Sequence, residues 1–175
     1  MRTHDPYAGR CNKAIYLVRD VRSVLLSQYR QALRSGYRGD LESFLQTFTT
    51  GNVNPFCFWG DHVNFWLDSE LAGSGRLFVV RFEALRQDTQ AELSKLLDFL
   101  EVSVLPETIA EAIADNSLER MREKEDRASS KEIRNVGDRH RFVGEGSVTG
   151  WQGKLEPEQL RRLEEAARSA LDRVG

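Results

Sequence analysis

The sequence predicts an α/β fold with a parallel sheet flanked by helices. Two apolar runs rich in strand-forming residues, 13–19 and 76–82, are each followed by apolar residues at helical spacing. Strands that alternate with helices are typical of a parallel sheet. The 175 residues match the length of a single domain, and the formal net charge of −2 provides no global basic field of the kind that favours nucleic acid.

The first strand and helix are expected between residues 13 and 36. The run from Lys13 to Arg19 is typical of a strand buried on both faces. From Asp20 onward the apolar residues recur at helical spacing. Gly36 is suited to end this helix, because glycine adopts the left-handed conformation common just after a helix.

Two more helices are expected before the second strand. Asp40 can cap a helix that continues through Thr49. Asn54 and Pro55 can open another that continues through Leu67, because proline is favoured at the first helical position. The aromatic residues of this second helix are expected to form its buried face.

The second strand, 76–82, is expected to lead through Asp88 into an amphipathic helix with leucines at 93, 96, 97 and 100. A short helix is expected from Pro106 to Ala114, and another start at Ser117. The charged stretch 122–141 has almost no apolar anchor and is predicted to be a mobile loop.

The last helix is expected to begin near Pro157, after a glycine-rich turn segment at 144–153. The longest apolar run, Ala14–Val18, is far shorter than the roughly 20 residues of a membrane helix, so no membrane span is expected. The first residues show no apolar stretch typical of a secretory signal, which favours a cytoplasmic location. Cys11 and Cys57 fit no disulfide or metal spacing and are expected to be reduced packing residues.

Arg19 is a candidate anion-binding residue. A strand that ends in arginine and turns into a helix places a cation beside helix amides. Ser27 follows about two helical turns later, roughly 10 Å along the helix, so both side chains could bind one phosphate. The alternative is that Arg19 forms a local ion pair with Asp20, which is common at strand ends.

His4 is a candidate general base, because histidine titrates near neutral pH and open α/β sheets bind ligands at the ends of their strands. The alternative is an ordinary surface histidine. His62 and His140 have no metal-ligand spacing with His4, so no metal is expected.

In order and spacing, several motifs resemble the sulfotransferases that use 3′-phosphoadenosine 5′-phosphosulfate (PAPS). The motifs are Arg2-Thr3-His4, Tyr16 to Asp20 with Ser27, Trp59 to Val63, Val80 to Leu85, Asn116 to Met121 and Phe142 to Trp151. The eight-residue offset between Arg19 and Ser27 is the most specific match. The likeness covers nearly the whole chain and implies a P-loop-like fold of three layers.

The resemblance implies a role for each candidate residue. His4 corresponds to the catalytic base that takes a proton from the acceptor hydroxyl, and Arg19 and Ser27 to the residues that hold the 3′-phosphate of PAPS. Phe82 and Ser117 are expected to border the nucleotide. The acceptor is open among small molecules, glycans and peptides.

Three positions depart from the family pattern. Phe82 replaces a tyrosine, and Leu118 replaces a phenylalanine near the adenine. Gly144-Glu145-Gly146 stands where the family has Arg-Lys-Gly, so a second cation for the 3′-phosphate is missing from its expected place. Arg139 or Arg141 could substitute for it.

The family also carries an upstream strand and a Lys-Ser-Gly-Thr-Thr loop for the phosphosulfate, and these residues do not contain them. We therefore expect a fragment, a late translational start or a chain that a partner completes. The sheet is then expected to have an open edge, suited to self-association or a partner chain. The competing interpretation is a non-catalytic remnant that serves as a nucleotide-binding or interaction module. A third interpretation is a relative of the P-loop kinases, and the missing loop disfavours it.

Overall fold

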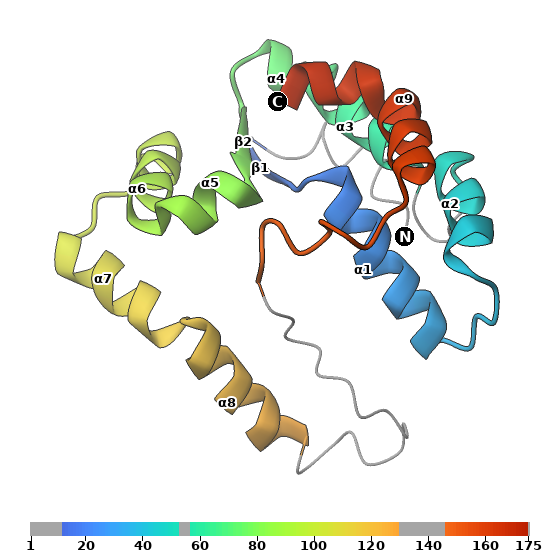
Figure 1. Cartoon of the computed structure of the whole chain (residues 1–175). Helices are drawn as coiled ribbons and strands as arrows, with labels where there is room; N and C mark the ends of the chain where they lie inside the picture. The colour runs from blue at the N-terminus through green and yellow to red at the C-terminus, as the bar shows by residue number, and fades with distance from the viewer. Residues whose placement is uncertain (1–11, 53–56, 130–145, 175) are drawn as a thin grey trace. The chain divides into compact units, whose positions relative to one another are not determined.

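The computed structural model describes residues 12–52, 57–129 and 146–174 (Figure 1). Strands alternate with helices along the chain, which confirms the α/β class. The elements in chain order are β1 (Ala14–Val18), α1 (Val21–Arg34), α2 (Leu41–Thr49), α3 (Trp59–Leu67), α4 (Glu70–Gly73), β2 (Leu77–Arg81), α5 (Phe82–Gln87), α6 (Thr89–Leu100), α7 (Pro106–Asp115), α8 (Leu118–Ser129) and α9 (Pro157–Val174).

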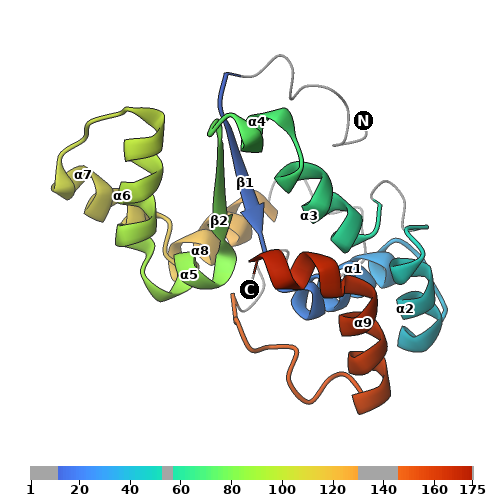
Figure 2. The ribbon, with the colours of Figure 1, turned by 90° about the horizontal axis from the view of Figure 1, so that it is seen from above.

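Within the described residues the sheet consists of β1 and β2, which run parallel and lie side by side in both ribbon views (Figures 1 and 2). The register pairs Ala14 with Leu77 and Val18 with Arg81. Both strands were predicted from their apolar runs. Because the strands are parallel, the residues that follow them, Arg19 and Phe82, emerge at the same end of the sheet.

The predicted starts of α1, α2 and α6 are confirmed, each at an aspartate that caps the helix. The carboxylate of Asp20 accepts a hydrogen bond from the backbone N–H of Arg22, and Asp40 and Asp88 cap α2 and α6 in the same way. Such a cap satisfies an amide that has no partner within the helix. Gly36, with a φ of 98°, lies just beyond the end of α1 as expected.

The third helix begins later than the sequence predicts. Asn54 and Pro55 lie outside the described residues, and α3 starts only at Trp59. Phe58 is extended, with ψ at 144°, and its buried ring packs edge-on against Phe48 at 5.7 Å between centroids. Burial of this ring in the core holds the backbone extended up to the helix start.

Phe82 is the first residue of α5, whereas the sequence predicts it as the end of a strand. Two tertiary contacts act at this point. The guanidinium of Arg19 lies over the Phe82 ring, and Glu83 accepts a hydrogen bond from the backbone N–H of Asp20. These contacts to the end of β1 favour a turn into helix over a longer strand.

The charged stretch 122–141 is predicted as a loop, but its described part is helical and belongs to α8, which continues to Ser129. Its charges are spaced for pairing along one helix face. Glu123 pairs with Arg120 three residues before it and with Arg127 four residues after it. Pairs at these spacings stabilise helices by a few tenths of a kcal/mol each. Residues 130–141 of the predicted loop lie outside the described part.

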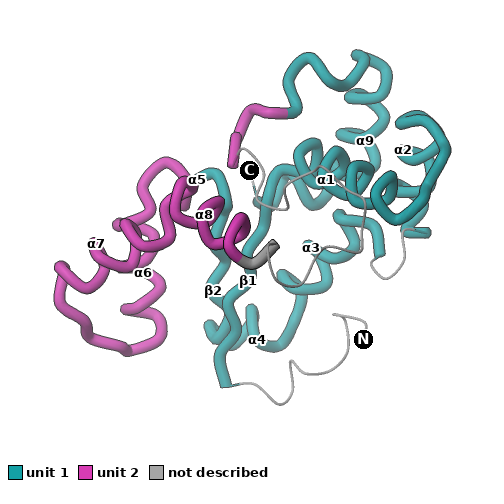
Figure 3. Tube along the Cα trace, turned by 90° about the horizontal axis from the view of Figure 1, so that it is seen from below, with its two compact units in different colours: residues 1–84, 151–175 teal, residues 85–150 magenta. Residues whose placement is uncertain are grey.

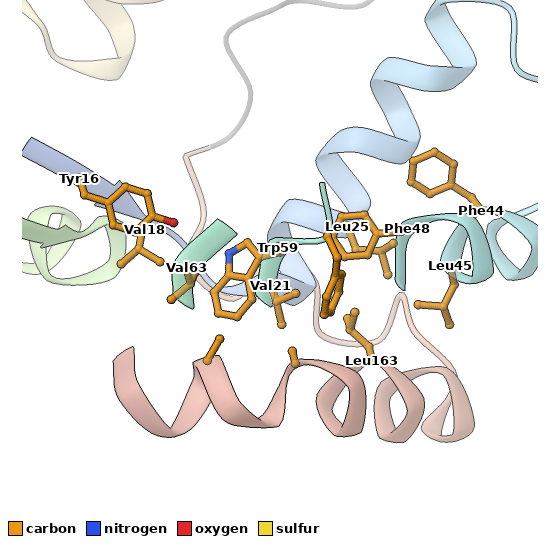
Figure 4. Packing of buried hydrophobic residues seen from close by; sticks show 13 residues of the cluster. Tyr16, Val18, Val21, Leu25, Phe44, Leu45, Phe48, Trp59, Val63 and Leu163 are labelled. Atoms are coloured by element: carbon orange, nitrogen blue, oxygen red, sulfur yellow. The ribbon is translucent and has the colours of Figure 1, made fainter. Parts of the chain in front are cut away.

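The hydrophobic core lies between the sheet, α1, α2, α3 and α9, and the C-terminal helix α9 packs against the other three helices. Figure 4 shows Val21, Trp59 and Val63 directed toward α9, from which Leu163 points back into the cluster. Val21, Val63 and Leu163 are completely buried. The predicted aromatic buried face of α3 is confirmed for Trp59, which is buried, and for Trp66, which packs against the core, whereas Phe65 is 40% exposed.

The contacts divide the chain into two compact units (Figure 3). Unit 1 comprises residues 1–84 and 151–175 and contains the sheet and the core. Unit 2 comprises residues 85–150 and contains α6, α7 and α8, of which α6 and α7 pack together. The expectation of a single domain over residues 1–175 stays a prediction.

Candidate functional site

Arg19 and Phe82 form the centre of the candidate site, at the carboxyl end of the sheet in unit 1. The guanidinium carbon of Arg19 lies 4.2 Å from the centroid of the Phe82 ring. Arg19 directly follows β1, and Phe82 directly follows its neighbour β2. Stacking of this kind holds an arginine in a fixed direction while its N–H groups stay in the plane of the guanidinium.

The backbone at the end of β1 is fixed from two sides. Trp59 donates a hydrogen bond from its indole Nε1 to the carbonyl oxygen of Arg19, at 3.0 Å. Glu83 accepts a hydrogen bond from the backbone N–H of Asp20, at 3.1 Å. The position from which the Arg19 side chain projects is therefore set by α3 and α5.

Burial lowers the pKa of the Arg19 guanidinium, the negative charge of Glu83 raises it, and the positive charge of Arg30 lowers it again. Asp20 has a smaller effect in the raising direction. Arg19 therefore lies half-buried, with a carboxylate and a second arginine near enough to act on it. A desolvated cation is a stronger partner for an anion than a fully hydrated one.

The carboxylate of Asp20, which the sequence offers as an alternative partner for Arg19, makes its contacts with Arg22. This carboxylate forms an ion pair with Arg22 and caps α1 by accepting from the Arg22 backbone N–H at 2.8 Å. Arg22 also pairs with Glu164 at 3.0 Å, and its guanidinium carbon lies 4.1 Å from the centroid of the Trp151 ring. The Arg22 amide at the start of α1 is therefore occupied by Asp20, and the affinity of this place for an anion depends on Arg19.

A cavity of about 120 Å³ opens beside Arg19. This volume is below the roughly 300–1,000 Å³ of pockets that enclose whole ligands, and neither Ser27 nor Phe82 lines the cavity. The lining residues come from the ends of both strands and from α1, α3, α5 and α9. They are Val18, Arg19, Asp20, Arg22, Trp59, Arg81, Glu83, Leu171 and Val174.

The other candidate residues lie in different places. Ser27 is exposed on α1, and its hydroxyl has no hydrogen bond within the described residues. Ser117 belongs to unit 2, where its Oγ accepts a hydrogen bond from the backbone N–H of Arg120 at 3.3 Å and so caps α8. His4 lies outside the described residues, as do Arg139 and Arg141.

A second polar pair lies inside unit 1. The Tyr16 hydroxyl and the His62 Nδ1 are 2.9 Å apart, and the Tyr16 ring stacks on Trp66 with centroids 5.6 Å apart. Burial is the largest cause that raises the pKa of Tyr16, followed by the nearby Cys57. Burial likewise raises the pKa of the Cys57 thiol, which is free and half-buried, whereas Cys11 lies outside the described residues.

Sequence reasoning did not single out Glu83, Arg30 or Trp59 as parts of the site. Glu83 had a signal, because an acidic residue directly after a predicted buried strand emerges at the ligand-binding edge of a parallel sheet. Trp59 contacts Arg19 from 40 residues away in sequence, and no local pattern reveals such a contact. Arg30 acts on Arg19 from α1, the helix that directly follows Arg19.

Within the described ranges, no cluster of three or more histidine, cysteine or acidic side chains could hold a metal ion. The same part of the chain has no helix that is both long and apolar enough to cross a membrane.

The comparison with protein families assigns the class of protein. The model of the sulfotransferase domain matches residues 6–175. The chain belongs to this family.

The similar proteins are sulfotransferases of animals and plants. Cytosolic sulfotransferase 15 of Arabidopsis thaliana is 28% identical over 160 residues, which cover 86% of this chain and 44% of that protein. Sulfotransferase 1E1 of Rattus norvegicus is 31% identical over 113 residues, which cover 63% of this chain and 37% of that protein. The chain thus spans about half the length, or less, of these curated relatives.

Solved structures show the same fold. Mouse sulfotransferase SULT7A1, complexed with PAP, has a TM-score of 0.74 at 23% identity, with 91% of this chain and 58% of that one covered. Retinol dehydratase, in complex with androsterone and the inactive cofactor PAP, has a TM-score of 0.79 at 18% identity, covering 95% and 49%. The predicted three-layer, P-loop-like fold class is therefore confirmed.

Proposed function

We propose that this chain is the part of a sulfotransferase that binds the 3′-phosphoadenosine end of PAPS and acts on a hydroxyl acceptor. The observation that carries the proposal is the guanidinium of Arg19, stacked on Phe82 where two parallel strands end. In the sulfotransferases that this chain resembles, the residue corresponding to Arg19 holds the 3′-phosphate of PAPS. The PAP complexes of mouse sulfotransferase SULT7A1 and retinol dehydratase support the same ligand.

The residues of the chain fit the 3′-phosphoadenosine group. Arg19 supplies a directed cation, and the Ser27 hydroxyl supplies a donor without a hydrogen bond in the described part of the chain. Phe82 offers an aromatic surface beside them. The two carboxylates at this place already have partners, since Asp20 pairs with Arg22 and Glu83 accepts from the Asp20 amide.

In this proposal each residue has one task. Arg19 and Ser27 bind the 3′-phosphate, and Phe82 and Ser117 border the nucleotide. His4 takes the proton from the acceptor hydroxyl, as a base with a pKa near neutrality can. When bound, PAPS supplies the sulfuryl group, and the protein contributes mainly orientation and stabilisation of charge. No metal takes part in the proposed reaction.

The acceptor is proposed only as a class, a hydroxyl compound. Retinol dehydratase has been crystallised with androsterone and with retinol, which supports a small-molecule alcohol here over a glycan or a peptide. A cytoplasmic location is supported by the name of the cytosolic Arabidopsis relative.

A second candidate function is a non-catalytic module that keeps the nucleotide half-site and works with another chain. One observation favours it. Gly144 and Glu145 stand where the family carries cations.

The nucleotide half of the proposal is tested by calorimetric titration with adenosine 3′,5′-bisphosphate (PAP). 5′-AMP is the control ligand without the 3′-phosphate, and Arg168→Ala, an exposed arginine of α9, is the control variant. We expect the bisphosphate to bind more tightly than 5′-AMP and Arg19→Ala to abolish the difference. Equal affinity for the two ligands would contradict the proposal.

The catalytic half is tested by assays of sulfuryl transfer with the chain joined to the phosphosulfate-loop half of a relative. We expect His4→Ala to lower turnover by about 10²–10⁴-fold, the usual contribution of a general base. The matched control is His140→Ala. Sulfated product formed at the same rate by His4→Ala and the unaltered protein would exclude His4 as the base. If the joined protein binds PAPS and forms no product, the binding-module function is favoured.

A further inference from the structure

Helix α1 carries a polar stripe on the side opposite Val21 and Leu25. Ser23, Ser27, Arg30 and Arg34 are spaced at intervals of four, three and four residues, so they lie on one side of the helix. The buried residues Val21 and Leu25 lie on the opposite side. Ser23 is itself buried near the start of α1, while Ser27 and Arg30 are exposed. The stripe therefore leaves the protein interior close to Arg19 and continues toward solvent.

Arg30 is the neighbour of Ser27 on this stripe. Its guanidinium makes no hydrogen bond and no ion pair within the described ranges. Its charge nevertheless acts on Arg19. Burial is the largest cause that lowers the pKa of Arg19, and the positive charge of Arg30 acts in the same direction, more strongly than the adjacent Asp20 acts against it. Arg30 lies on the same side of α1 as Ser27, and the Asp20 carboxylate is turned toward Arg22.

The charge balance at Arg19 calls for a second cation. A phosphate monoester carries about −1.5 to −2 charges at neutral pH. Arg19 supplies one positive charge, and Glu83, the strongest charged influence on it, offsets part of that charge. Two arginines that repel each other gain most when an anion binds between them, because the repulsion turns into two attractions.

We propose that Arg30 is a phosphate-binding residue, which together with Arg19 and Ser27 holds the 3′-phosphate of the nucleotide. This inference rests on the proposed function and names the second cation of that site. Arg30 would then take the place of the cation that Gly144 and Glu145 do not supply. Ser27 lies one helical turn before Arg30 on the same helix face, so a phosphate that binds Arg19 and Ser27 would also contact Arg30 in this proposal.

The test is calorimetric titration of the chain with adenosine 3′,5′-bisphosphate and with 5′-AMP. The variants are Arg30→Gln, Arg30→Lys, Arg19→Ala, the double variant Arg139→Ala/Arg141→Ala and, as the matched control, Arg168→Gln. Circular dichroism and thermal unfolding check that each variant is folded. Arg30 is exposed, so Arg30→Gln is expected to leave the unfolding temperature unchanged.

We expect Arg30→Gln to weaken binding of the bisphosphate about tenfold and to leave the affinity for 5′-AMP unchanged, as loss of one charge-assisted contact to the 3′-phosphate predicts. The affinity of Arg30→Lys for the bisphosphate is expected to lie between those of Arg30→Gln and the unaltered chain, because lysine keeps the charge and loses the bidentate geometry. Arg168→Gln is expected to bind like the unaltered chain.

Two results would overturn the proposal, and they differ in meaning. Bisphosphate binding that depends on Arg19 but not on Arg30 would refute the role of Arg30 and leave the proposed function intact. In that case a loss in the Arg139→Ala/Arg141→Ala variant would identify the alternative cation. Failure of the folded, unaltered chain to prefer the bisphosphate over 5′-AMP would overturn the proposed function, and the role of Arg30 with it.

Discussion

Arg22 holds together the region in which β1 turns into α1. Its guanidinium pairs with Asp20, which caps its own helix, and with Glu164 of α9, and it stacks on the ring of Trp151. The side chains of Arg22 and Asp20 are 26% and 14% exposed, so the pair is screened less than one at the surface. Arg22 thereby fixes the backbone from which Arg19 projects.

Replacement of Arg22 by alanine is expected to lower the free energy of unfolding by about 1–2 kcal/mol, because partly buried charge-assisted hydrogen bonds are lost. The measurement is the urea midpoint at neutral pH. The control is Arg161→Ala on α9, which loses two pairs, to Glu158 and Glu165, between exposed side chains. Surface pairs contribute little, so a larger loss for Arg161→Ala than for Arg22→Ala would contradict this account.

Ionisation of Tyr16 is expected to lower the stability of the folded chain at alkaline pH. Burial raises the pKa of Tyr16 above its ordinary value of 10.0 in the folded chain. Once the pH exceeds about 10, the unfolded chain releases this proton and the folded chain keeps it. The contribution of Tyr16 to stability is therefore complete below pH 10 and is lost as the pH rises toward the folded-state pKa.

The expected size of this effect is about 1.4 kcal/mol for each pH unit above 10, the value for one proton. Urea unfolding of the unaltered chain and of Tyr16→Phe at pH 8 and pH 11 measures it. Tyr16→Phe should be less stable at pH 8, because it loses the hydrogen bond to His62. The deficit should shrink or reverse at pH 11. If Tyr16→Phe is less stable than the unaltered chain by the same amount at both pH values, the pKa of Tyr16 is not raised in the folded chain.

At the scale of the elements, the sequence predicts those helices and strands whose signals are local. An aspartate before an apolar stripe marks the starts of α1, α2 and α6, and the apolar runs mark β1 and β2. The start of α3 and the existence of α5 could not be predicted in this way. They depend on the burial of Phe58 and on contacts of Phe82 and Glu83 with the end of β1.

The candidate site shows the same division. The sequence alone shows the eight-residue offset between Arg19 and Ser27 and the aromatic residue at position 82. That Arg19 stacks on Phe82, and that Trp59 binds its carbonyl oxygen, depends on the register of the sheet and the packing of α3. Both partners are distant in sequence. Only the folded chain brings these residues together.

Helix α9 completes the core of unit 1, and Leu163 is its completely buried leucine. Leu163→Ala is expected to lower the free energy of unfolding by about 2–5 kcal/mol, the range for buried leucines that leave a cavity. Chemical denaturation measures the loss. The matched control is Leu105→Ala, since Leu105 is 69% exposed and should cost less than about 0.5 kcal/mol. Similar losses for the two variants would mean that α9 does not form part of the core.

At the scale of the whole molecule, strand β1 exposes two apolar side chains to solvent. Tyr16 and Val18 of β1 are buried against the core, whereas the alternate residues Ile15 and Leu17 are 45% and 54% exposed. In the described part of the chain the sheet consists of two strands, and exposed apolar sheet surfaces favour association. The relatives are about twice as long as this chain, so they contain further residues that could cover such a face.

We therefore expect the isolated chain to associate with itself through the Ile15 and Leu17 face as its concentration rises. Leu17→Lys should shift the population toward monomer in sedimentation velocity, because a charge on this face must be desolvated when two copies meet. Leu105→Lys, which adds the same charge at an exposed leucine of unit 2, should leave the association unchanged. If Leu105→Lys disperses the protein and Leu17→Lys does not, association occurs through unit 2 and the open sheet face is not its cause.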